Sequence, residues 1–218
     1  MDNTARSKCQ PLSDTSSWNP DNNEYNRKVD QRLAEDSTEV FGNFSYENAQ
    51  YIISRFVETA AESVTIFAGS IPGDFYGKSL GPDGIPFYKA IEKASQNIVT
   101  KKKQRNASAE SSIRIITIDG KRDTDLVRFA ETTNMKYGVP VIKIFQTRYT
   151  GQAKLKHYLV VDHKRYRLEE YHESFGDKTP AILKAEVCCN NPNKSAIMEN
   201  SFDQLWSMLS SQNNKSEE

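Results

Sequence analysis

Apolar residues in the first half of the chain alternate between helical spacing and short continuous runs. Spacings of three and four residues predict three helices, over 45–60, over 86–105 and from Asp123 or Thr124 onward. Short β-rich runs between them predict three strands, over 64–68, 113–118 and 140–145. Ser45 is the expected N-cap of the first helix, and Pro86 is the expected first residue of the second.

The second half of the chain changes to closely spaced strands. Apolar runs predict strands over 158–161, 165–168 and 184–188. The first two leave no room for a helix between them, so we expect a hairpin that turns at His163 and Lys164. A final helix is expected to begin with Asn191 as cap and Pro192 as first residue. The pattern as a whole predicts an α/β fold, a mixed β-sheet flanked by helices.

Both ends of the chain are poor in apolar residues. Residues 1–43 are rich in Asn, Asp, Ser, Glu and Arg, which predicts a disordered polar tail. Val29 and Leu33 would allow a short helix there, with a thin apolar stripe. We therefore expect one domain over 44–210 and a second disordered end over 211–218.

Charge and cysteine usage indicate an intracellular protein without a global preference for charged partners. Lys+Arg and Asp+Glu both number 29, so attraction to nucleic acid or membrane could come only from local patches. The first twenty residues hold no apolar run, and we expect no signal peptide, no membrane span and a cytoplasmic location. The three cysteines, Cys9, Cys188 and Cys189, fit a reducing compartment.

Residues 154–206 contain a set of residues at family-specific spacing. They are the strand ending at Asp162, then Glu186, then the helical segment Phe202-Asp-Gln-Leu-Trp206. This frame resembles one repeat of the phospholipase D superfamily, in which a strand carries His-x-Lys-x4-Asp. A Gly-Ser pair, an Asn, a Glu-bearing strand and a helix with Phe-x-x-Leu-Trp follow. The order of the predicted elements over 45–210 is similar to that of the same family.

The resemblance places other residues at each catalytic position. Counting from Asp162, the nucleophile position is Leu155 and the lysine position is His157. The Gly-Ser pair falls on Glu169 and Glu170, and the Asn falls on His172. Leucine cannot attack phosphorus, and a carboxylate about 4 Å from a phosphate charge would repel it by ~4 kcal/mol at an effective dielectric of about 20. The resemblance therefore implies a degenerate repeat that serves binding or assembly.

The resemblance also implies partners. In the family the site forms between two repeats, so a chain with one repeat must form a homodimer to build it. Degenerate members occur as accessory parts of bacterial nuclease, restriction and defence systems, which suggests a nucleic-acid-related complex. No cofactor is implied.

An enzyme remains the main alternative. A phosphodiesterase or nuclease could use rearranged catalytic groups, and the candidate catalytic residues are His157, Asp162, Glu170 and His172. With Glu169 or Glu186 these side chains are also nitrogen and oxygen ligands of the kind that bind zinc or manganese. His157 and Asp162 are an odd number of residues apart, so an unbroken strand would point them to opposite faces and only a bend at Asp162 would bring them together. We expect no metal site.

Other segments offer weaker candidates. The basic residues near aromatics or at a helix end are potential ligand-binding groups: Lys101, Lys103, Lys156, Arg165 and Arg167. Residues 72–79 end in Gly-Lys-Ser but lack the first glycine of a phosphate-binding loop and the following helix. A third alternative is a structural subunit whose apolar loop over 71–87 docks a larger partner.

Overall fold

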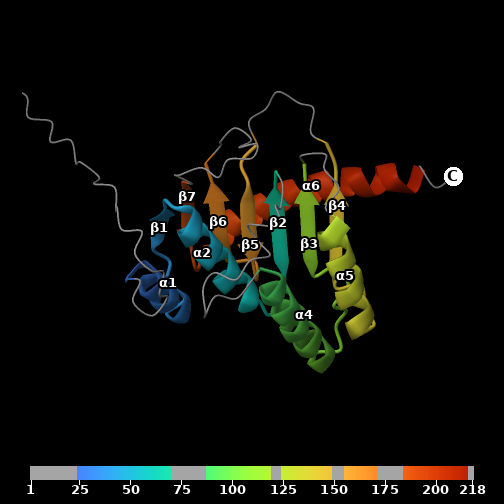
Figure 1. The fold of residues 1–218 in the computed structure, drawn as a ribbon, viewed down its shortest axis with the longest axis horizontal. Helices are drawn as coiled ribbons and strands as arrows, with labels where there is room; N and C mark the ends of the chain where they lie inside the picture. The colour runs from blue at the N-terminus through green and yellow to red at the C-terminus, as the bar shows by residue number, and fades with distance from the viewer. Residues whose placement is uncertain (1–23, 70–86, 119–123, 149–154, 171–183, 216–218) are drawn as a thin grey trace, which may run out of the picture.

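A seven-stranded mixed sheet forms the centre of the molecule (Figure 1). The computed structural model describes residues 24–69, 87–118, 124–148, 155–170 and 184–215. The strands are β1 (Val40–Asn43), β2 (Val64–Ala68), β3 (Ile113–Thr117), β4 (Ile142–Gln146), β5 (Tyr158–Val161), β6 (Arg165–Glu169) and β7 (Ala185–Cys188). Their spatial order is β1-β7-β6-β5-β2-β3-β4; β2, β3 and β4 are parallel, and the other neighbours pair antiparallel. The predicted α/β class is confirmed.

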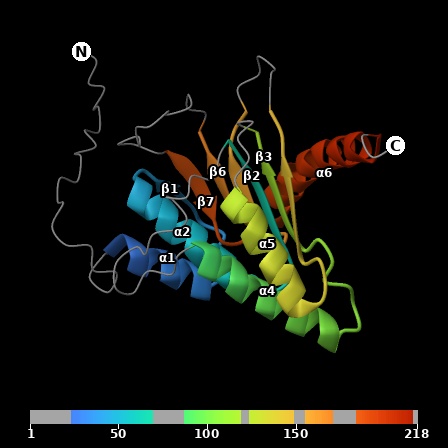
Figure 2. The ribbon, with the colours of Figure 1, turned by 45° about the vertical axis from the view of Figure 1, so that its right-hand side comes forward.

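Helices cover both faces of this sheet (Figures 1 and 2). On one face lie α1 (Glu24–Ala34), α2 (Tyr46–Glu58), α4 (Phe87–Gln104) and α5 (Thr124–Tyr137), whose buried side chains share a core with Ile66, Ile115 and Leu159 of the sheet. On the other face α6 (Pro192–Lys215) crosses the strands and extends past β4. Phe202 of α6 packs there against Phe67 and Ile116.

The predicted helix starts are confirmed by their caps. The Ser45 hydroxyl accepts a hydrogen bond from the Asn48 backbone N–H at 3.1 Å, which satisfies one donor of the first turn of α2. The Asn191 side chain accepts from the Lys194 N–H at 3.0 Å, and Pro192 is the first residue of α6.

The expected domain limits are wrong at both ends. Residues 24–43, which we assigned to a disordered tail, form α1 and β1. Val29 of α1 is fully buried, and β1 pairs antiparallel with β7 from Val40 opposite Cys188 to Asn43 opposite Ala185. At the other end α6 continues to Lys215, beyond the expected limit at residue 210. Residues 1–23 and 216–218 lie outside the described ranges.

The β5–β6 hairpin turns over residues 162–164, between paired Val161 and Arg165, so the predicted turn at His163 and Lys164 is confirmed. In this turn Asp162 and His163 have φ of 52° and 60°, and the Lys164 N–H donates to the Val161 carbonyl at 3.2 Å. Asp is one of the few L-residues that adopt a positive φ at little cost, which suits Asp162 to this turn. None of the described helices is long and apolar enough to cross a membrane.

Candidate functional site

The two ends of the β5–β6 hairpin hold different polar groups at opposite edges of the sheet. We call the edge where β2, β3 and β4 end the upper edge, which is at the top of Figure 1, and the opposite edge the lower edge. Because β5 is antiparallel to β2, His157 lies at the upper edge and Asp162 at the lower. Five residues of extended chain separate them by about 16 Å.

At the upper edge, His157 lies against the end of β2. A Cβ atom on Gly69 would be 2.9 Å from His157 Nε2, so the imidazole occupies the space that a side chain at position 69 would need. The Nδ1 atom of His157 is 4.0 Å from Oε2 of Glu169, and the Glu169 N–H donates to the His157 carbonyl at 2.9 Å. The imidazole and the Glu169 carboxylate are therefore neighbours at the distance limit of an ion pair.

Arg167 joins this carboxylate to β1. Its Nη1 donates to Glu169 Oε2 at 3.0 Å, and its Nε donates to Asn43 Oδ1 at 2.9 Å. The Asn43 amide in turn donates to the Ser45 carbonyl at 2.9 Å, next to the start of α2. The side chains of Arg167 and Glu169 are only 4% and 9% exposed. These residues form the upper-edge cluster: His157, Arg167, Glu169 and Asn43.

The other positions assigned by the phospholipase D resemblance do not join this cluster. Leu155 packs against the apolar group under α6 that contains Phe67 and Phe202. Glu170 is exposed, and its backbone N–H donates to the Lys184 carbonyl at 2.8 Å. His172 lies outside the described residues.

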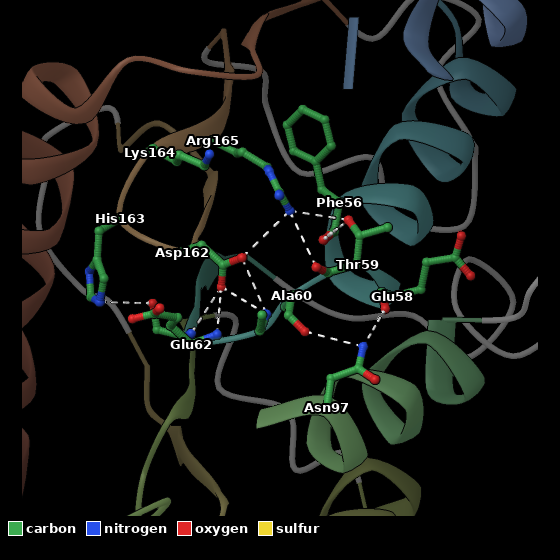
Figure 3. Close-up of polar contacts among 12 residues, drawn as sticks. Phe56, Glu58, Thr59, Ala60, Glu62, Asn97, Asp162, His163, Lys164 and Arg165 are labelled. Carbon is green, nitrogen blue, oxygen red and sulfur yellow. Dashed lines mark hydrogen bonds and ion pairs between the residues drawn. The ribbon is translucent and has the colours of Figure 1, made fainter. Parts of the chain in front are cut away.

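At the lower edge, Asp162 holds the connection between α2 and β2 (Figure 3). One oxygen of its carboxylate accepts from the backbone N–H groups of Ala61, Glu62 and Ser63 at 3.0, 2.8 and 3.2 Å. Arg165 lies beside it, with Nη1 at 3.6 Å from Asp162 Oδ2. Asp162 is thus a structural anchor, and the hypothesis that a bend brings it beside His157 is wrong.

His163, next to this anchor, links the hairpin turn to α6. Its Nδ1 lies 2.9 Å from Glu199 Oε1, and its Nε2 lies 3.2 Å from the Ser63 hydroxyl. The hydrogen bond with Glu199 raises the pKa of His163 above its ordinary value, and partial burial opposes the rise. This pair connects structural elements and is remote from the upper-edge cluster.

No metal cluster forms from the residues that the structure describes. A search of these residues for three or more grouped His, Cys, Asp or Glu side chains finds none. Glu186, which we considered as a ligand, lies on the α6 side of the sheet, where it accepts from the Tyr166 hydroxyl and from Lys194.

The five basic candidates do not form one surface. Lys101 donates to Glu62 at 2.9 Å at the lower edge, and hydrogen bonds from Lys101 and Arg105 lower the pKa of Glu62 to about 2. Of the other four, Lys103 and Lys156 have exposed side chains, and Arg165 and Arg167 have largely buried side chains. These five side chains are therefore dispersed over the molecule, and their role in ligand binding stays a prediction.

Sequence reasoning missed Asn43, because it lay in the segment that we assigned to a tail. The apolar pair Val40-Phe41 just before it was the available signal for a strand. Of the loop considered for docking, only Phe87 is described, and it is 3% exposed within the core. The rest of 71–87, with the Gly-Lys-Ser segment, lies outside the described residues.

Comparison with known proteins finds similarity at the level of three-dimensional structure. No protein-family model and no curated protein matches the sequence. Nuc from Salmonella typhimurium, a phospholipase D family member, is 14% identical with a TM-score of 0.48, over 78% of this chain and 94% of Nuc. NucT from Helicobacter pylori is 12% identical with a TM-score of 0.44, over 78% of this chain and 97% of NucT.

A third similar structure is TrmBL2, an archaeal chromatin protein that binds DNA. It is 10% identical with a TM-score of 0.47, and the match covers 84% of this chain and 59% of TrmBL2. Identities and scores of this size concern the fold alone. The chemistry of this chain is therefore inferred from its own residues.

Proposed function

We propose that the chain is a non-catalytic phospholipase D-like module that binds or assembles with a partner. The carrying observation is Leu155, at the position that the resemblance assigns to the nucleophilic histidine. Its side chain packs into an apolar group with Phe67 and Phe202, so it supplies neither a nucleophile nor room for one. The lysine position holds His157, pressed against Gly69.

The electrostatics of the upper edge also support a binding role without phosphoryl transfer. Glu169 replaces the glycine of the family pattern, and its carboxylate already takes the hydrogen bond of Arg167 Nη1. A substrate phosphate beside this carboxylate would meet like charge in a largely buried setting, where repulsion is poorly screened. The exposed carboxylate of Glu170 adds to the repulsion.

The proposed partners are a second copy of this chain and a nucleic-acid-related or defence complex, as the family resemblance suggests. Exposed Lys103 and Lys156 are the candidates for phosphate contacts, because the other three basic side chains are paired or buried. The alternative is a nuclease with rearranged groups, which would use His157 as acid or base, with Glu169 at 4.0 Å.

A cleavage assay separates the two functions. Single- and double-stranded DNA and RNA are incubated with the full chain, with and without Mn²⁺ or Zn²⁺, beside a His157→Ala, Glu170→Ala double variant. We expect no cleavage by either protein. Metal-dependent or metal-free cleavage that the double variant loses would overturn the non-catalytic function and make the upper-edge cluster an active site.

Binding and assembly are measured separately from cleavage. Light scattering on the eluting protein gives the oligomeric state, for which we expect a dimer. Fluorescence anisotropy with labelled oligonucleotides at two salt concentrations tests for phosphate contacts, which weaken steeply as salt rises. Lys103→Glu with Lys156→Glu should weaken binding for all sequences alike, and Lys28→Glu, whose side chain pairs with Glu24 on α1, is the matched control.

A further inference from the structure

Arg167 is buried with one of its nitrogens unpaired. The residue is 3% exposed, its Nε is bonded to Asn43 and its Nη1 to Glu169. Its Nη2 is buried and has no hydrogen-bond partner among the described residues. A guanidinium offers five N–H donors and no acceptor, and buried donors in native proteins are nearly always paired with protein, water or a ligand. The unpaired Nη2 therefore points to an acceptor that the described part of the chain does not supply.

Helix α1 carries a second buried polar side chain, that of Asn26. Asn26 is 1% exposed, and within the part of the chain that the structure describes both its Oδ1 and its Nδ2 lack a hydrogen-bond partner. The neighbouring Tyr25 places this turn of α1 near Arg167, because its hydroxyl donates at 3.0 Å to the carbonyl of Gly42, the residue before Asn43. Burial raises the pKa of Tyr25, and the positive charge of Arg167 partly opposes the rise, as expected for close groups.

We propose that Arg167 Nη2 anchors a binding site for a small oxyanion, a phosphate or carboxylate group, enclosed between α1, β1 and β6. An oxyanion would accept a charge-assisted hydrogen bond from Nη2. The site uses the nitrogen of Arg167 that does not hold Glu169. It is therefore independent of whether the chain cleaves nucleic acid, and its test does not use cleavage.

Titration of the full chain with inorganic phosphate tests the proposal. Calorimetry and the midpoint of thermal unfolding are measured with phosphate, with acetate and with chloride at constant ionic strength. We expect saturable binding of phosphate or acetate that raises the midpoint. Arg167→Lys, which keeps the charge but removes Nη2, should weaken the affinity at least tenfold. Arg165→Lys, two residues along β6 with its side chain at Asp162, should leave the affinity unchanged.

A second variant decides the matter if Arg167→Lys does not fold. Glu169→Gln keeps the shape of the side chain and removes the internal negative charge beside Arg167, so it should bind phosphate at least tenfold more tightly. Absence of saturable binding by both the native chain and Glu169→Gln would overturn the proposal, since Nη2 would then be satisfied by water alone.

A further arm distinguishes a free oxyanion from a nucleic-acid backbone. A short oligonucleotide without a terminal phosphate replaces inorganic phosphate in the same titrations. Because the site is enclosed, we expect no shift of the midpoint that depends on Arg167. An Arg167-dependent shift with the oligonucleotide alone would overturn the assignment of a small free ligand.

Discussion

The two ends of one hairpin differ in the kind of groups that hold them in place. At the lower edge, one carboxylate oxygen of Asp162 accepts from three consecutive backbone N–H groups, with Arg165 alongside. At the upper edge, Arg167 and Glu169 form a buried side-chain pair. The lower end is therefore held mainly by backbone donors and the upper end by paired side chains. At each end one buried guanidinium nitrogen, Arg165 Nε or Arg167 Nη2, lacks a partner among the described residues.

The two ends of the hairpin also differ in their position on the sheet. The upper edge is where the parallel strands β2, β3 and β4 end, and in open α/β sheets ligands bind outside the carboxyl ends of such strands. The lower edge is tied by Asp162 and by Asn97 of α4, whose amide donates to the carbonyls of Glu58 and Ala60 at 3.1 and 3.3 Å (Figure 3). Binding is therefore expected at the upper end and rigidity at the lower.

The largest expected effect comes from breaking the buried pair at the upper edge. Arg167→Met leaves the Glu169 carboxylate buried without its cation, and such changes cost about 3–5 kcal/mol of unfolding free energy. Urea unfolding monitored by fluorescence measures the loss. The double variant Arg167→Met, Glu169→Leu should recover most of it, because no uncompensated charge is left. A loss below about 1 kcal/mol in the single variant would show that the pair is solvated.

A smaller loss is expected from the lower edge. Asp162→Ala removes the acceptor of three backbone N–H groups and places Ala at a φ of 52°, which together cost about 2–3 kcal/mol. Asp162→Asn should lose less, since Asn tolerates positive φ and keeps one acceptor oxygen. Urea unfolding of both variants measures their losses of unfolding free energy. If Asn and Ala were equally damaging, the negative charge rather than the turn geometry would be the essential feature.

Local patterns predicted most elements but not the limits of the domain. Helix caps and apolar periodicity depend on residues close in sequence, so the starts of α2 and α6 could be predicted from Ser45 and Asn191. The short β1 depends on pairing with β7, roughly 145 residues later, and its four residues carry no alternating pattern strong enough to find it. The turn at His163 and Lys164 could be predicted from the short gap between two apolar runs, although no glycine marks its positive φ angles.

The candidate site was only partly predictable, because it also depends on contacts between residues that are far apart in the sequence. Arg167 and Glu169 are two residues apart on one strand and therefore lie on the same face of the sheet. Their side chains are buried because α1 and β1 lie next to them, and the polar composition of residues 1–43 gave no sign of these elements. The sequence therefore indicated only that Arg167 was a candidate ligand-binding residue. Spacing from Asp162 assigned Leu155 to the nucleophile position and His157 to the lysine position. Only the structure shows that Leu155 packs against the apolar group under α6 that contains Phe67 and Phe202.

Restoring the family's nucleophile should have a modest effect on stability and none on activity. Leu155→His places an imidazole in a half-buried apolar group, which costs about 1–3 kcal/mol. Leu155→Met, which conserves volume, should lose less than about 1.5 kcal/mol. Cleavage of a chromogenic phosphodiester is expected to remain absent, because His157 and Glu169 still depart from the family pattern. Activity in Leu155→His would show that the upper edge lacks only its nucleophile.

The smallest expected effect is a pH dependence at the lower edge. The hydrogen bond with Glu199 raises the pKa of His163, and the carboxylates of Asp162 and Glu62 act in the same direction. A raised pKa in the folded state means that the stabilisation is complete below the unfolded-state pKa of about 6.5 and is lost as the pH rises through the folded-state pKa. Because the His163 side chain is 60% exposed, solvent screening limits the contribution to about 1 kcal/mol or less. His163→Asn, which tolerates the positive φ, should therefore narrow the difference between urea midpoints at pH 5.5 and pH 8.5. Parallel pH profiles for the two proteins would mean that His163 does not couple α6 to the hairpin turn through its charge.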